Sequence, residues 1–428
     1  MTGEWTQRHK LTRMAGFASA IAVGSLLPAL ALAADIVLAV PNGSEGDGLR
    51  AAADDYQKMK GITIDIVQAP YANLFEKAAN AGASKSGAYD IVLMDDPWLP
   101  FFAENGYLEP LGKYFQALGT DGPDSDFLGK SIALCRNPYN TGPFVCLPYV
   151  GNAQMFFYDP EEFAKQGLPE GPKTWDDVIK AAAAVSKAGG GERFGYVMRA
   201  AEGNPVVADF MPIFWSYGAD LFDKDRKPNL LTPEAKKAVE VFLQLKEVSP
   251  PGVESFQADE VGTFIAQGAA ASAINWPNWV ATFEDPAQSK VVGKIAHSPI
   301  PSGTKAGSSE IGHWLMGIMS DAPHKQAAFD FMIWATSPEQ IKKSAERGNP
   351  PVRFSVFTDP DLTSQEQFRH FPVLMEAINF STPRPRHPKW PEIENAFGAE
   401  LSKAVAGAET GDEALANAQK AIEEILAR

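Results

Sequence analysis

Apolar and polar positions alternate between strand-like and helix-like stretches early in the chain. Segments 35–40 and 62–67 are short and apolar or alternating, as is typical of strands, and 89–94 is mostly apolar and typical of a buried strand. Helical periodicity follows the first two strands, reaching about Lys60 after a polar loop over 41–48 and then covering 71–83. Strands alternating with helices predict βαβ units around a mainly parallel sheet, and therefore an α/β fold.

Further along, helix start signals become frequent. Thr174 and Thr410 each precede an acid by three residues, which resembles a capping box, and Thr232 precedes a proline that suits the first helical position. No internal repeat, heptad run or low-complexity linker occurs. Two domains without a tether suggest a chain that passes between them more than once, and the strand-like stretches 144–149, 294–299 and 348–354 are the candidate crossings.

The N-terminus has the pattern of a secretory signal peptide over residues 1–33. Basic residues precede an apolar run over 14–32, and Ala31 and Ala33 form an A-x-A ending. The alternative is a transmembrane anchor, but Gly16, Gly24 and Pro28 interrupt the run. No cysteine stands at the expected cleavage boundary, so we expect a freely diffusing periplasmic protein and not a lipid-anchored one.

Length and charge narrow the functional classes. Residues 34–428 are too many for one core, which predicts two or three domains. Removing the leader takes away three basic residues and one acid, moving the formal charge from −15 to −17. That acidity argues against nucleic acid or an anionic membrane as a partner.

The chain contains two cysteines, Cys135 and Cys146, separated by turn-forming residues. In an exported protein such a pair predicts a disulfide across a turn. A catalytic thiol is the alternative, although no histidine lies near either cysteine in the sequence.

Sequence signatures of catalysis are missing. There is no nucleophile elbow, Walker loop, dinucleotide fingerprint or metal-ligand spacing, so we expect neither enzyme activity, cofactor nor metal. Asp95 and Asp96 are adjacent, and adjacent strand residues point to opposite faces, which makes them a poor pair of glycosidase acids. These absences favour a binding function over a catalytic one.

Aromatic residues stand beside polar ones where predicted strands end, the edge at which open α/β sheets bind ligands. Asp95 and Trp98 follow the strand at 89–94, Trp276 follows the apolar stretch 269–274, and Trp314 precedes 315–319. Flat rings pack on the C–H faces of sugars while charged and amide groups bond to their hydroxyls. Core packing is the alternative for each tryptophan.

With these motifs in place, the chain resembles the extracellular solute-binding proteins of carbohydrate ABC importers, the maltose-binding-protein-like group. The resemblance covers essentially all of 34–428. It is carried by the order and spacing of fragments that are weak singly: Tyr89-Asp90-Ile91-Val92, Leu147-Pro148-Tyr149, Phe157-Tyr158-Asp159, Pro172-Lys173-Thr174-Trp175-Asp176-Asp177, Gly312-His313-Trp314, and Arg353 within 350–357.

The resemblance implies a two-lobed, type II periplasmic-binding-protein fold with an interdomain ligand cleft, two or three hinge crossings and closure by hinge motion. It implies lobes of 34–145 plus 298–346 and of 146–297 plus 347–428, a monomer, and delivery of a small carbohydrate or polyol to permease subunits. The implied cleft residues are Asn42, Ser44, Glu45, Asp95, Trp98, Tyr149, Asn152, Arg199, Trp276, Trp314 and Arg353.

Within that set, the resemblance implies that Trp276 and Trp314 stack on sugar faces and that Asp95 accepts hydrogen bonds from hydroxyls. It also implies that Arg353 and Arg199 donate hydrogen bonds to the solute. His313 departs from the family pattern, because a second small residue is common there. The sequence also leaves open an anionic sugar, which His313 and the two arginines would suit, a polyamine, or a role as a secreted carbohydrate-active enzyme.

Overall fold

The computed structural model describes residues 35–428. The signal peptide expected over residues 1–33 lies outside the described residues. Within the described chain, no helix is both long enough and apolar enough to cross a membrane.

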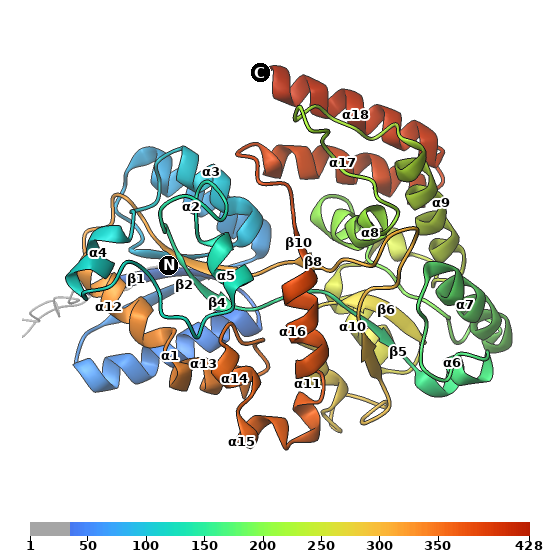
Figure 1. Cartoon of the computed structure of the whole chain (residues 1–428), viewed down its shortest axis with the longest axis horizontal. Coiled ribbons are helices and arrows are strands. Elements are labelled where there is room, and N and C mark those ends of the chain that lie inside the picture. The colour runs from blue at the N-terminus through green and yellow to red at the C-terminus, as the bar shows by residue number, and fades with distance from the viewer. Residues whose placement is uncertain (1–34) are drawn as a thin grey trace, which may run out of the picture. The chain divides into compact units, whose positions relative to one another are not determined.

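The first sheet has five strands in the order β2-β1-β3-β9-β4 (Figure 1). β1 pairs in parallel with β2 and β3, as the strand–helix alternation predicts, whereas β9 runs antiparallel to both β3 and β4. The strands are β1 Ile36–Pro41, β2 Ile64–Ala69, β3 Ile91–Asp95, β4 Leu147–Val150 and β9 Trp314–Ile318.

Helices pack around this sheet and supply its larger apolar core. The first of them begins at Ser44, inside the segment expected to be a loop. Gly43 takes φ 102 at its N-cap, and a side chain at Gly46 would meet the Pro41 carbonyl, so glycines let the helix start directly after β1. The helices are α1 Ser44–Lys60, α2 Tyr71–Ser84, η1 Asp96–Trp98, α3 Leu99–Glu104, α4 Gly112–Ala117, α5 Gly129–Leu134, α12 Lys325–Ala335 and α13 Pro338–Ala345.

The second sheet is antiparallel, in the order β6-β5-β7. Side chains alternate along its central strand, so Phe157 packs into the larger core while Phe156 packs into a second core. The elements are β5 Met155–Tyr158, β6 Ser272–Asn275, β7 Ala296–Ser298, α6 Pro160–Lys165, α7 Trp175–Gly189, α8 Asn204–Ser216, α9 Pro233–Glu247, η2 Val253–Ser255, α10 Ala258–Ala266 and α11 Trp279–Phe283.

The last third of the chain contributes helices to both cores. The capping signals at Thr174, Thr232 and Thr410 are confirmed, since each threonine side chain accepts a backbone N–H at the start of its helix. The remaining helices are α14 Phe354–Phe357, α15 Pro360–Thr363, η3 Glu366–Phe368, α16 Phe371–Phe380, α17 Trp390–Val405 and α18 Gly411–Ala427, and the last two pack beside α8 and α9 (Figure 1).

Three segments run side by side between the two sheets. β8 Glu310–Ile311 pairs in parallel with β10 Thr382–Pro383, and Ala153 forms an antiparallel bridge with Ile311. Three crossings therefore join the sheets: one between β4 and β5, one through β8, and one through β10.

These crossings differ from the stretches that the sequence suggested. The expected crossing at 144–149 contains most of β4, which belongs to the first sheet, and the one at 294–299 contains β7 of the second sheet. The stretch 348–354 pairs with the first crossing and with Leu128, since the carbonyls of Pro350 and Val352 accept from Gly151 and Leu128. The stretches 144–149 and 294–299 complete their hydrogen bonds within the two sheets, whereas the crossing strands β8 and β10 pair with each other between them.

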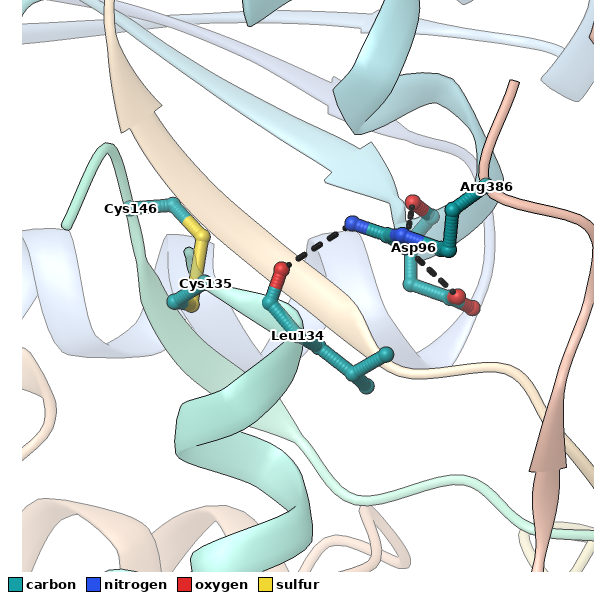
Figure 2. Close-up of a disulfide and its surroundings, with 5 residues drawn as sticks. All are labelled: Asp96, Leu134, Cys135, Cys146 and Arg386. Carbon is teal, nitrogen blue, oxygen red and sulfur yellow. Dashed lines mark hydrogen bonds and ion pairs between the residues drawn. A yellow bond between two sulfur atoms is a disulfide. The ribbon is translucent and has the colours of Figure 1, made fainter. Parts of the chain in front are cut away.

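The predicted disulfide between Cys135 and Cys146 is present and joins the end of α5 to the start of β4 (Figure 2). The two Cα atoms lie 5.0 Å apart, within the usual range for a disulfide. Neither cysteine is free, so the catalytic-thiol alternative has no support.

Candidate functional site

A buried arginine organises the polar groups at the end of β3. Arg384, the residue after β10, places Nη2 2.9 Å from both carboxylate oxygens of Asp95 and 3.2 Å from Asp96 Oδ1. Tyr71 donates to Asp95 Oδ2 at 2.8 Å. Although burial by itself lowers the pKa of Arg384, Asp95 and Glu310 hold it well above its ordinary value. The Asp95 carboxylate therefore already accepts hydrogen bonds from two side chains.

Arg386 also binds the polar groups at the end of β3. It donates to the Asp96 carbonyl at 2.8 Å and to the Leu134 carbonyl at 3.1 Å, directly before the disulfide (Figure 2). Burial raises the pKa of Asp96 to about 7 against the opposing effect of Arg384. The disulfide thus fixes the helix end that anchors the segment carrying both arginines.

Aromatic side chains form one wall beside Asp95. Trp314 faces Asp95 across the β3–β9 pair, and its ring packs edge-on against Tyr71 and Trp98, with centroids 6.1 and 6.0 Å away. Trp98 and Trp314 are both buried, so they also pack the core, whereas Trp276 is half-buried.

Trp276 approaches from the second sheet. A side-chain carbon at Gly312 would come within 2.6 Å of the Trp276 ring, so the missing side chain at Gly312 lets this ring approach the second crossing. The Arg199 guanidinium lies 5.3 Å from the Trp276 ring centroid, a cation–π contact. Trp276 thereby meets the residues that follow β8.

Arg199 is paired internally. Its Nε donates to Asp209 Oδ1 at 2.6 Å, and both residues are buried. Burial raises the pKa of Asp209, although Arg199 opposes this. Among the described residues, Arg199 Nη2 has no hydrogen-bond partner, so one donor of this guanidinium is still available.

Glu310 is the least satisfied group near the arginines. It is fully buried, and within the described chain neither of its carboxyl oxygens has a hydrogen-bond partner. Oε1 lies 3.5 Å from Arg384 Nε, an ion-pair contact in which Nε also lacks a hydrogen bond. Burial raises the pKa of Glu310 to about 8, although Arg384 and Arg199 lower it.

Polar side chains from three separate segments meet at the start of α1. Asn278 donates to Ser44 Oγ at 3.3 Å, and Asn349 donates to the Ser44 carbonyl at 3.0 Å. Asn152, on the first crossing, donates to Glu45 Oε1 at 3.4 Å, and burial raises the pKa of Glu45. Ser44, Glu45 and Asn152 are therefore brought together.

Three predicted residues have other surroundings. Arg353 donates to Asp124, Asp126 and the Thr336 carbonyl and lies over Phe127. Tyr149 lies 3.3 Å from Ser344 Oγ, and burial raises its pKa to about 12. Asn42 is exposed. In the region the structure describes, no side-chain hydrogen bond or ion pair joins these three to the other candidates.

His313 is also used within the fold. Its ring nitrogens lie 2.7 Å from Ser131 Oγ and 2.9 Å from the Asn152 carbonyl, and burial lowers its pKa to about 4. A neutral, fully bonded imidazole offers no charge to an anion. Its place between α5 and the first crossing explains why a larger residue fits where the resemblance suggests a small one.

The profile of one family, described as bacterial extracellular solute-binding protein, matches residues 41–342. The chain belongs to that family. A probable amino-acid ABC transporter periplasmic-binding protein of Sinorhizobium fredii is 26% identical over 97% of this chain and 98% of its own length. A mannitol-binding protein of Pseudomonas aeruginosa is 26% identical over 79% of this chain and 80% of its own.

A solved structure is similar throughout. An ABC transporter solute-binding protein of Agrobacterium radiobacter, in complex with ribitol, superposes with a TM-score of 0.84 at 28% identity, covering 91% of this chain and 98% of the other. The type II periplasmic-binding-protein fold predicted from the sequence is confirmed.

Arg384, Glu310 and Arg386 were missed by the sequence reasoning. Two arginines spaced between prolines in Pro383-Arg384-Pro385-Arg386 were the available signal, because prolines hold a segment extended and bring alternate side chains to one face. Glu310 had no such signal, since its place depends on the pairing of β8 with β10.

Proposed function

We propose that this chain captures a neutral polyhydroxylated solute, a polyol or small sugar, and presents it to an ABC importer. One observation carries the proposal: buried carboxyl and guanidinium groups at Glu310, Arg384 and Arg199 have unused hydrogen-bonding atoms, and Arg199 contacts the half-buried ring of Trp276. Hydroxyls take both donors and acceptors, and the aromatic face suits the C–H groups of a sugar chain.

Similar proteins support the solute class. The Agrobacterium structure contains ribitol, and the Pseudomonas relative is named for mannitol. Both compounds are uncharged and carry a hydroxyl on every carbon, which suits a site rich in paired donors and acceptors.

An anionic solute or a polyamine is less well supported. Arg353 and Arg199, the two arginines considered for an anion, are already paired with Asp124 and Asp209. His313 is neutral and fully bonded. We also propose binding without catalysis, because Arg384 and Tyr71 already engage the Asp95 carboxylate.

We propose that each sheet belongs to one of two lobes, and that the two lobes close on the solute. The crossings suggest a first lobe built on 35–150 and 314–380 and a second built on 155–298 and 384–428. The contacts of Ser44 with Asn278 and of Glu45 with Asn152 are proposed to form when the lobes close. We further propose that the mature protein is a periplasmic monomer that delivers its solute to permease subunits.

The solute can be identified with purified protein lacking residues 1–33. Thermal shift and titration calorimetry would cover tetritols, pentitols, hexitols, monosaccharides and disaccharides, with amino acids and polyamines as comparison classes. We expect saturable binding of at least one polyol or sugar, with a rise in Tm that follows mass action. Binding only to amino acids or polyamines would refute the proposed solute class.

A further inference from the structure

Glu310 is held in place by its backbone on both sides. Its residue pairs with Thr382 in β10, and its carbonyl accepts from Gln154 N at 3.0 Å on the first crossing. All three crossings therefore meet at this residue. A side chain fixed at that point keeps its position relative to both sheets.

The carboxyl of Glu310 has an ion-pair contact with Arg384 but accepts no hydrogen bond within the described part of the chain. Both oxygens are buried and lack a hydrogen bond to any residue the structure describes. Arg384 Nε and Arg199 Nη2 are unpaired in the same way, and Nε lies 3.5 Å from Glu310 Oε1. Buried polar atoms normally find partners, so an acceptor–donor set left open at one place indicates a ligand-binding site.

The adjoining aromatic ring limits what can bind. Gly312, two residues after Glu310, lets the Trp276 ring reach the same segment, and the Trp276 ring also contacts Arg199. A solute that contacts both groups presents a C–H face to the ring and hydroxyls to the carboxyl.

The surrounding charges disfavour an anion. The charged groups nearest to Glu310 are Arg384, Arg199, Glu394 and Asp95. Arg384 is shared with Asp95 and Asp96, and Arg199 is paired with Asp209. Both guanidinium charges are therefore balanced, and a carboxylate on the solute would have no free cation.

We propose that Glu310 is the specificity-determining residue of this site, and that it selects a neutral hydroxyl over the carboxylate of the corresponding sugar acid. This inference rests on the proposed function and names the group that recognises the solute.

The protonation state of Glu310 supports the assignment. Burial raises its pKa to about 8, so the acid keeps its proton at neutral pH. A protonated carboxyl both donates and accepts, as does a hydroxyl, and the two can bond reciprocally. Above that pH the proton is lost, and a buried negative charge faces the solute.

The test compares Glu310→Gln and Glu310→Ala with wild type by calorimetry. The probes are two alditols with their acids, ribitol with ribonate and D-mannitol with D-mannonate, at pH 6.5 and pH 9. Wild type is expected to prefer the alditol and to lose about tenfold in alditol affinity at pH 9. Glu310→Gln keeps a neutral donor and acceptor, so its alditol affinity should stay within about fivefold of wild type. That affinity should no longer depend on pH.

Glu310→Ala is expected to weaken alditol binding by about tenfold or more and to narrow the alditol-to-acid preference. Glu109→Gln serves as the matched control, since Glu109 pairs with Lys113 and Lys325 away from the site. Circular dichroism checks folding, and the Gln variant decides the case if the Ala variant does not fold. Unchanged preference in Glu310→Ala, or retained pH dependence in Glu310→Gln, overturns the inference while the proposed function stands. If wild type binds no polyol or sugar, both fail together.

Discussion

At the scale of single residues, the strongest expected effect belongs to Arg384. Arg384→Met removes the cation shared by Asp95, Asp96 and Glu310 and leaves buried carboxyls unpaired. We expect the free energy of unfolding to fall by about 3–5 kcal/mol at pH 7. Urea denaturation measures it, and the loss should shrink at pH 5.5, where Asp96, with its pKa of about 7, is protonated.

A double-mutant cycle sharpens that expectation. Asp95→Asn combined with Arg384→Met should cost less than the sum of the single changes, because the second change removes a charge that the first left unpaired. Additive losses would show that Arg384 acts by packing and not by pairing.

Substitution of Trp276 should weaken solute binding while leaving the stability of the solute-free protein nearly unchanged. Its ring is half-buried and contacts Arg199, so Trp276→Leu should leave the Tm of the solute-free protein within a few degrees of wild type. Affinity for a polyol found by calorimetry should fall about tenfold, in line with about 0.5–1.5 kcal/mol for an aromatic contact beyond its buried area. Gly312→Ala should mimic it, because the new methyl would displace the ring. If both variants bound the polyol as tightly as wild type, the solute would have to bind elsewhere.

Sequence reasoning grouped part of the candidate site because short-range rules place aromatic and acidic residues where strands end. Asp95, Trp98 and Trp314 were found in this way, and the structure sets them side by side. Arg384 and Glu310 were not found, since their meeting depends on two crossings, distant in the sequence, that pair as β8 and β10. Arg353 was expected in the cleft, and its side chain is bonded to Asp124 and Asp126 and to none of the other candidates.

At the scale of elements, the disulfide joins α5 to β4 and stabilises the anchor of Arg386 at Leu134. Cys135→Ser combined with Cys146→Ser should lower the free energy of unfolding by about 2–4 kcal/mol, because the unfolded chain regains the entropy of the open loop. Thermal unfolding with and without reductant measures this. The double variant should be insensitive to reductant, and a reductant effect of equal size in that variant would refute the assignment.

Element boundaries followed local chemistry closely. Capping threonines located the starts of α7, α9 and α18, and periodicity located α2 and the first three strands to within two residues. The crossings could not be predicted in the same way. They are the short segments 151–154, β8 and β10, whose pairing is set by neighbouring segments that are distant in the sequence.

At the scale of the whole molecule, buried ionisable groups fix how stability depends on pH. Burial raises the pKa of Asp96 to about 7 and that of Glu310 to about 8. The folded chain therefore holds these protons after the unfolded chain has released them, and stability falls as pH rises towards 8. Burial lowers the pKa of His313 to about 4 and that of His370 to about 3. Unfolded histidines gain protons below about 6.5, so stability also falls at acidic pH.

These opposing effects predict a maximum in the Tm of the solute-free protein between about pH 5 and 6.5, since each group changes stability by up to about 1.4 kcal/mol per pH unit within its window. Scanning calorimetry from pH 4 to pH 9 measures the curve. Glu310→Gln removes one of the alkaline contributions, so its Tm should decline less between pH 6.5 and pH 8 than that of wild type. A wild-type Tm that rises steadily up to pH 8.5 would show that the carboxyls at the crossings keep their ordinary pKa values, and it would remove the basis for a protonated Glu310 at neutral pH.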